Sequence, residues 1–294
     1  MRQVKIITDS CADIGSDLRT RYDIDYARMK TVYEGKEQWA SLDWEYYAPK
    51  ELYDIMRAGN RVMTTQVPAD EFERVFTNYL EKGFNIVYIA CSSKQSGSVN
   101  TGAVVARKLL ENYPEAEIYC IDSLNASMGE GMLTVRAAEY RDAGMSAKEI
   151  YEKILACRNN VNEYVTVHNL DALKRAGRVK GSAAFFGNLF GVKPIIISDK
   201  NGEQTPIKKV KGRQASLNEI VNLLKKSAVD TKDQIIYIAH ADCADEAEAV
   251  RQMILKEIPC KEVYFGYIGP IIGASIGPDA IGIFAFGKEI TYAV

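Results

Sequence analysis

The stretch NIVYIACSSKQSGSVNTGAVVARKLLENY, residues 85–113, decides the expected fold. Its first seven residues (85–91) form the apolar run of a buried strand, and residues 98–113 carry the spacing of an amphipathic helix. The run AEIYCID (116–122) reads as the next strand. Strands separated by a single helix are expected to lie parallel, with the helix packed on a face of their sheet.

The rest of the first half repeats this alternation. We expect a strand at 4–8 and helices at 49–59, 70–83, 127–144 and 146–161. Ser146 and Glu149 have the spacing of a capping box at the start of the last helix. The pattern predicts an α/β domain over residues 1–157, a mostly parallel sheet with helices on both faces.

The second half, residues 158–294, has more strand-like runs and fewer helices between them. The seven runs are YVTVH, KPIIIS, QTPIKKV, QIIYIAH, EVYFGYI, AIGIFAF and EITYAV. Runs that follow one another closely near the C-terminus favour hairpins, so we predict a mixed or antiparallel sheet with helices. The segment AAFFGNLFG (183–191) is apolar on nearly all sides, which predicts either a buried core helix or one wall of an apolar tunnel.

Composition excludes several classes of protein. The 294 residues are 47% hydrophobic and 26% charged, with a net charge of −2, which is typical of a globular protein and a poor match for nucleic acid. No apolar stretch approaches the length of a membrane span, and residues 1–10 show no signal peptide. The six cysteines lack a Cys-x-x-Cys pair, so we expect buried, reduced thiols and a cytoplasmic location. With only two histidines, no metal site is expected.

Hydroxyl side chains follow several of the predicted strands. Parallel sheets bind ligands beyond the carboxyl ends of their strands. The loops there offer Thr8 and Ser10, Thr64 and Thr65, Ser92, Ser93, Ser96 and Ser98 with Gly97, and Ser123. Hydroxyls and the free N–H groups of helix N-termini suit an anion, although the same residues also serve as ordinary helix caps.

Familiar catalytic motifs are missing from the sequence. It contains no P-loop, no Gly-x-Gly-x-x-Gly after the first strand, no His-Glu-x-x-His and no Gly-x-Ser-x-Gly. A serine hydrolase that uses Ser93 or Ser96 with His240 stays open as an alternative. His240 otherwise reads as a structural histidine at a strand end.

The segment GPIIGASIGPDAIG (269–282) contains four glycines and two Gly-Pro pairs between two strand-like runs. We expect a shaped loop whose backbone approaches a ligand, or alternatively a tight linker between hairpin strands. Ordering such a loop is costly, because glycine loses more backbone freedom on folding than any other residue.

These motifs occur in a characteristic order. TDS, TTQ, SSKQSG, a DS after a strand, GRV, KPII and the GPIIG segment run through residues 4–292. In this order they resemble the DegV family of bacterial fatty-acid-binding proteins, some of which are the lipid-binding subunit of a fatty acid kinase. The resemblance implies a non-enzymatic protein of two α/β domains, with a long-chain fatty acid in the cleft between them as its one ligand and no further cofactor.

The resemblance also implies roles for individual residues. The carboxylate is expected on the first domain and the acyl chain in the second. The implied ligand-binding residues are Thr64, Thr65, Ser92, Ser93, Ser96, Gly97 and Ser275. Many relatives carry a histidine where this chain has Ser275. Arg178 falls on the motif that is implicated in contact with the kinase. A lipid sensor without a kinase partner is the remaining alternative.

Overall fold

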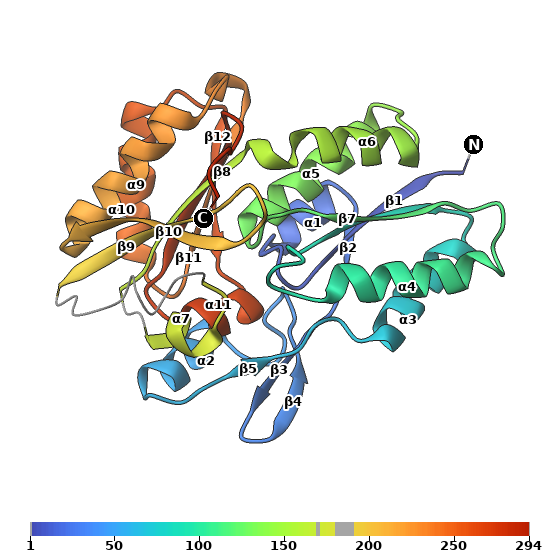
Figure 1. Cartoon of the computed structure of the whole chain (residues 1–294), viewed down its shortest axis with the longest axis horizontal. Coiled ribbons are helices and arrows are strands. Elements are labelled where there is room, and N and C mark those ends of the chain that lie inside the picture. Colours follow the sequence, from blue (N-terminus) through green and yellow to red (C-terminus); the bar gives the residue numbers. More distant parts are fainter. Residues whose placement is uncertain (1, 169–170, 180–190, 294) are drawn as a thin grey trace.

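We describe the fold from a computed structural model, which describes residues 2–168, 171–179 and 191–293. Most of the apolar helix that was predicted at residues 183–191 lies outside the described residues. The architecture is two α/β layers built on separate sheets, with a small third sheet at one side (Figure 1).

The first sheet is fully parallel and has the strand order β2-β1-β6-β7. Its strands are β1 (Val4–Asp9), β2 (Ile24–Ala27), β6 (Asn85–Ala90) and β7 (Ile118–Asp122). Ile6 lies opposite Ile24 on one side and Val87 on the other. All six residues of β1 and of β6 are buried, as expected for strands covered on both faces.

Helices cover both faces of this sheet (Figure 1). They are α1 (Ser16–Arg21), α3 (Ala69–Glu81), α4 (Ser98–Leu110), α5 (Met128–Asp142) and α6 (Ala147–Cys157), whereas α2 (Pro49–Arg57) lies away from this sheet. Helices α3 and α4 pack with Ile7 and Ile86, whereas α5 and α6 pack with Ile6 and Val87 on the opposite face. The predicted capping box of Ser146 and Glu149 is present at the start of α6.

A small antiparallel sheet, which we had not predicted, lies beside the first. It consists of β3 (Lys30–Tyr33), β4 (Lys36–Trp39) and β5 (Met63–Thr64), in the order β4-β3-β5. Strand β5 delivers the TTQ segment, because Thr64 pairs with Thr31 of β3.

The second sheet is mixed and has the order β10-β9-β8-β13-β11-β12. Its strands are β8 (Val161–Thr166), β9 (Val192–Ser198), β10 (Gln204–Lys211), β11 (Ile235–His240), β12 (Glu262–Tyr267) and β13 (Ile281–Phe286). The described helices of this half are α7 (Asp171–Ala176), α9 (Arg213–Ser227), α10 (Ala244–Glu257) and α11 (Pro270–Ile276). All strands of the first sheet precede Cys157, and all strands and described helices of the second half follow it. The domain boundary at residue 157 itself stays a prediction.

The two faces of the second sheet have different partners. Ile236 and Ile238 of β11 pack with α9 and α10, whereas Tyr237 between them points to the opposite face. This follows from the period of two along a strand. The opposite face packs on α5, which also packs on β1 and is therefore held between the two sheets. Ten residues of α5 are buried, and they include the polar residues Glu130 and Thr134.

Three predictions for the second half were wrong. Residues 289–294 were expected as a strand, but none is assigned among the described residues there. The expected C-terminal hairpin is also absent, because β11 lies between β12 and β13, and the hairpin is instead formed by β9 and β10. The third error is the GPIIG segment, which was expected to be a loop.

Pro270–Ile276 forms the helix α11. Proline is tolerated at the first helical position, and Gly277 ends the helix at a φ of +85°. Inside the helix, a Cβ at Gly273 would lie 2.5 Å from the Tyr53 hydroxyl of α2. The glycine composition therefore lets a short helix of the second half pack closely against the first.

Candidate functional site

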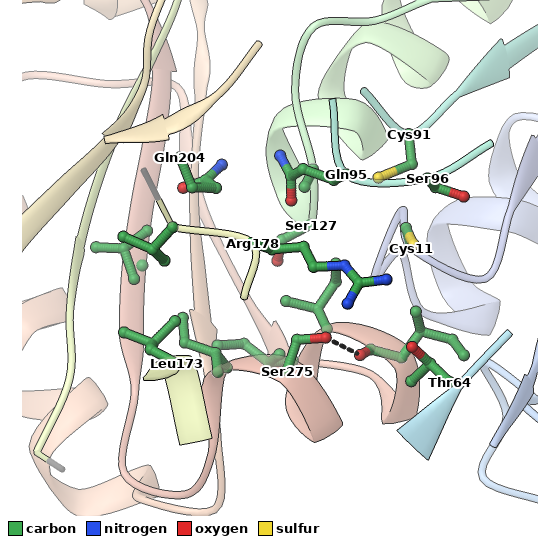
Figure 2. Close-up of a pocket in the computed structure, with 18 of the residues that line it drawn as sticks. Cys11, Thr64, Cys91, Gln95, Ser96, Ser127, Leu173, Arg178, Gln204 and Ser275 are labelled. Atoms are coloured by element: carbon green, nitrogen blue, oxygen red, sulfur yellow. Dashed lines mark hydrogen bonds between the residues drawn. The ribbon is translucent and has the colours of Figure 1, made fainter. Parts of the chain in front are cut away.

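A cavity of about 190 Å³ lies between the carboxyl edge of the first sheet and the inner face of the second (Figure 2). Residues from both halves line it. They are Cys11, Met29, Thr64, Thr65, Gln66, Cys91, Gln95, Ser96, Gly97, Ala126, Ser127, Glu163, Val165, Leu173, Arg178, Val179, Ile196, Gln204, Ile268, Ile271, Ile272, Ser275, Ile276, Gly282 and Phe284.

The first-half side of the cavity is polar. Thr64 and Thr65 reach it from the end of β5, and Ser96 and Gly97 reach it from the loop before α4. The Ser96 hydroxyl lies 2.9 Å from that of Ser98, which accepts the Val67 N–H. Among the described residues, nothing hydrogen-bonds the Thr64 hydroxyl. The edge therefore keeps a hydroxyl free for a ligand.

Arg178 brings a positive charge to this side. Its side chain reaches across the cavity toward the side that carries Thr64, Ser96 and Cys11 (Figure 2). Nη1 donates to the Ala176 carbonyl at 2.6 Å, and no carboxylate of the described residues pairs with the guanidinium. Arg178 is exposed, and a guanidinium without a carboxylate partner can pair with an anion bound in the cavity. From the family resemblance we expected Arg178 to contact a partner protein, and we did not predict that it lines the cavity.

Two predicted serines do not line the cavity. Ser92 is fully buried, and its hydroxyl donates to the Gly202 carbonyl of the β9–β10 hairpin at 2.7 Å. Ser93 is exposed, and its N–H donates to Asp122. Of the loop residues that follow Cys91, Gln95, Ser96 and Gly97 line the cavity, whereas Ser92 and Ser93 do not. The expectation that Ser93 meets the head group is therefore revised.

The opposite side of the cavity is apolar. Strands β8, β9 and β13 supply Val165, Ile196 and Phe284, all of which belong to the hydrophobic core of the same face. Helix α11 adds three isoleucines and Ser275, whose hydroxyl donates to the Ile271 carbonyl at 3.3 Å (Figure 2). An apolar wall of this kind favours contact with a hydrocarbon group, because the contact removes apolar surface from water.

Glu163 is the one acidic side chain of the described lining. It lies on β8, is 3% exposed, and its Oε1 accepts hydrogen bonds from Ser198 and Gln204. Burial raises the pKa of Glu163 to about 7, and these hydrogen bonds lower it in part. A carboxyl group inside the buried strand VNEYVT was a visible signal that the sequence reasoning did not use.

Asp13 ties α11 to the first half beside the cavity. Its Oδ2 accepts from the Ser127 hydroxyl at 2.5 Å, and its Oδ1 accepts from the Gly269 N–H at 2.8 Å. Burial raises the pKa of Asp13 to about 8, against the lowering effect of both hydrogen bonds. The start of α5 and the start of α11 are thus joined through one side chain.

A buried cluster of thiols and carboxyl groups lies at the base of the polar side. Cys11 follows β1 and Cys91 follows β6, so both stand at the edge that the parallel topology predicts for ligands. Asp9 accepts the N–H of each cysteine and the Tyr88 hydroxyl. Glu130 of α5 accepts from Thr8 at 2.7 Å. Sequence reasoning treated the cysteines as isolated core thiols, although the same strand-end rule applied to them.

Neither histidine is part of the cavity. His240 is buried at the end of β11, where its Nδ1 accepts the Cys243 N–H and its ring packs on Phe265 and Tyr267. Burial lowers the pKa of His240 to about 4. His168 lies in a separate surface hollow with Asp242 and Glu246. No serine–histidine pair of the described residues offers the geometry of a hydrolase.

None of the described helices is both long and apolar enough to cross a bilayer.

A family model described as an uncharacterised protein of the DegV family matches residues 3–288. The chain belongs to the DegV family. A DegV domain-containing protein from Clostridium perfringens is 35% identical over 98% of this chain and 98% of its own length. Another, from Streptococcus pyogenes, is 31% identical over 97% of this chain and 98% of its own.

Solved DegV structures share the fold. A DegV family protein from Thermus thermophilus, whose structure is described as showing fatty acid binding, has 26% identity and a TM-score of 0.88, covering 98% of this chain and 100% of that one. DegV from Bacillus subtilis, described as a fatty acid binding protein, shares the fold at 24% identity and a TM-score of 0.84, with the same coverage. The predicted pair of α/β layers, one parallel and one mixed, is confirmed.

Proposed function

We propose that this chain binds a long-chain fatty acid in the cavity between its two sheets. The carboxylate lies at Thr64, Ser96 and Arg178, and the acyl chain lies along Val165, Ile196 and Phe284. The observation that carries the proposal is the division of one cavity into a hydroxyl edge with an unpaired guanidinium and an apolar wall. Binding by the Thermus thermophilus relative supports the same class of ligand.

The energetics favour this ligand. Each buried methylene contributes roughly 0.8 kcal/mol, so a long acyl chain gains much more than a short one even after the cost of ordering it. The carboxylate then needs hydrogen bonds, because an unpaired ion in a dry site costs several kcal/mol. Arg178 and the free Thr64 hydroxyl supply them, so head group and chain are recognised by separate parts of the cavity.

Extraction of the purified protein with organic solvent, followed by mass spectrometry, tests the proposal. We expect a long-chain fatty acid in the extract, and a rise in Tm when oleate is added to delipidated protein. Oleyl alcohol, which has the same chain without the carboxylate, is the matched control and should give a smaller rise. An empty extract together with no response to oleate would contradict the proposal.

The resemblance to kinase subunits supports a further role as a carrier. In this role the chain acts in the cytoplasm, has no catalysis of its own, and presents the carboxylate to a fatty acid kinase that supplies nucleotide and metal. Acyl-phosphate formation with a cognate kinase, measured beside lipid affinity for Arg178→Ala, tests this. A rate loss larger than the affinity loss supports docking, whereas lipid binding without any kinase response favours a lipid sensor.

A further inference from the structure

Three groups that can bind a metal converge at the base of the cavity. The Sγ atoms of Cys11 and Cys91 and a carboxylate oxygen of Glu130 lie within 4.8 Å of one another. They come from the ends of two neighbouring parallel strands and from the first turn of α5. All three side chains are at most 2% exposed. The side chains are thus brought together by the fold and not by local sequence.

No positively charged side chain of the described residues pairs directly with this trio, although Arg178 lines the same cavity. Among the described residues, no lysine or arginine pairs with Cys11, Cys91, Glu130 or the adjacent Asp9. Glu130 Oε1 accepts from the Thr8 hydroxyl, but Oε2 is buried without any hydrogen-bond partner. A buried carboxylate oxygen left unpaired costs free energy. A cation at this position would remove that cost.

The geometry points to a Zn²⁺ site formed by Cys11, Cys91 and Glu130. Zinc–sulfur bonds of about 2.3 Å in tetrahedral geometry place two sulfurs about 3.8 Å apart, so small side-chain rotations close the site. The Thr8 hydroxyl donates a hydrogen bond to the Glu130 carboxylate. Metal-binding carboxylates are commonly oriented by a hydrogen bond of this kind. Met29 Sδ, 3.6 Å from Cys11 Sγ, adds soft surroundings that suit zinc better than magnesium or calcium.

The fourth position of the ion opens to the cavity, because both cysteines belong to its lining (Figure 2). Three protein ligands with an open position are typical of zinc that binds water or a ligand oxygen. Binding releases to solvent the protons that the two thiols and the Glu130 carboxyl carry, and the two thiolates and the carboxylate together give the zinc site a net charge of −1. Without metal, the same position holds two neighbouring thiols beside the Glu130 carboxyl, and the experiment decides between these states.

The test uses tag-free protein that has been stripped with a chelator and titrated with Zn²⁺ against a chromophoric zinc chelator. We expect one Zn²⁺ per chain, with affinity lowered about a hundredfold in Cys91→Ser and about tenfold in Glu130→Gln. Cys260→Ser, which changes a half-buried thiol outside the cavity, is the control and should bind as the parent does. Undiminished binding in Cys91→Ser would overturn the assignment.

A second readout does not depend on any variant that folds poorly. Co²⁺ added to the unmodified stripped protein should give the thiolate-to-cobalt absorption of a tetrahedral site. Zn²⁺ should protect Cys11 and Cys91, but not Cys260, from alkylation after mild denaturant, as read by mass spectrometry. No cobalt band and no protection would show that the thiol pair holds no metal. Neither result depends on lipid, so either leaves the proposed fatty acid binding standing.

Discussion

The two sides of the cavity are built in different ways. The polar edge consists of loop ends whose hydroxyls hydrogen-bond one another locally, as Ser96 and Ser98 do. The apolar wall consists of strand side chains, such as Val165 and Phe284, that are also part of the hydrophobic core. Changes in the wall therefore affect both folding and binding, whereas changes at the edge affect binding alone. The predictions below test this difference.

The largest effect is expected from Phe284→Ala in the wall. Phe284 is 1% exposed, and its removal leaves a hole in the inner face of β13. Truncating a buried phenylalanine costs about 3–5 kcal/mol of unfolding free energy. Urea unfolding followed by circular dichroism measures it, with the exposed Val104→Ala as control. A loss below about 1 kcal/mol would mean that the wall is not part of the core.

Glu163→Gln tests the acidic side chain in the apolar wall through the pH dependence of the unfolding free energy. The pKa of Glu163 is raised from 4.5 to about 7, so its stabilising contribution is complete below pH 4.5 and is lost as pH rises through 7. A shift of this size corresponds to roughly 3 kcal/mol, at about 1.4 kcal/mol per pKa unit. The stability advantage of the parent protein over Glu163→Gln should therefore shrink by that amount between pH 4 and pH 8.

Unfolding in urea at several pH values measures this advantage. Glu115→Gln, which changes an exposed carboxyl in the loop between α4 and β7, is the control and should show a smaller change with pH. A difference that does not change with pH for Glu163→Gln would show that this carboxyl keeps an ordinary pKa in the wall.

Arg178→Glu examines the edge. Reversing the charge replaces an attraction to the carboxylate by a repulsion and should weaken oleate binding about tenfold to a hundredfold, with little change in unfolding free energy. Titration calorimetry on delipidated protein measures the affinity. Lys174→Glu, on the helix α7 that precedes Arg178 and exposed outside the cavity lining, is the control. Equal affinities for the two variants would remove Arg178 from the site.

The sequence predicted the edge better than the wall. Thr64, Thr65, Ser96 and Gly97 were named from the sequence, and all four line the cavity. Ser96 and Gly97 follow the parallel strand β6, whereas Thr64 lies in the antiparallel strand β5, and their contact with a ligand stays a prediction. The wall was not predicted residue by residue, because its members are alternate positions of strands whose order in a mixed sheet depends on long-range pairing.

One local error, at α11, and one prediction that stays untested, at Ser93, have the same physical origin. Helix α11 was taken for a loop because glycine and proline are poor helix formers, yet close packing of Gly273 on Tyr53 stabilises the helix. Ser93 was assigned to the head group because it follows a strand, but hydroxyl direction depends on where the loop turns. Tertiary contacts, which a single sequence does not display, decide both cases.

The smallest effect separates two hydroxyls of the same edge. Thr64→Val removes a hydroxyl that faces the cavity and keeps the shape of the side chain, so the carboxylate loses one hydrogen bond and affinity should fall about threefold to tenfold. Ser93→Ala removes an exposed hydroxyl outside the lining and should leave oleate affinity unchanged. Both are measured by the same calorimetric titration. A loss of affinity for Ser93→Ala with none for Thr64→Val would place the head group at the loop after β6. In that case a residue's position after a strand would predict head-group contact better than the direction of its side chain.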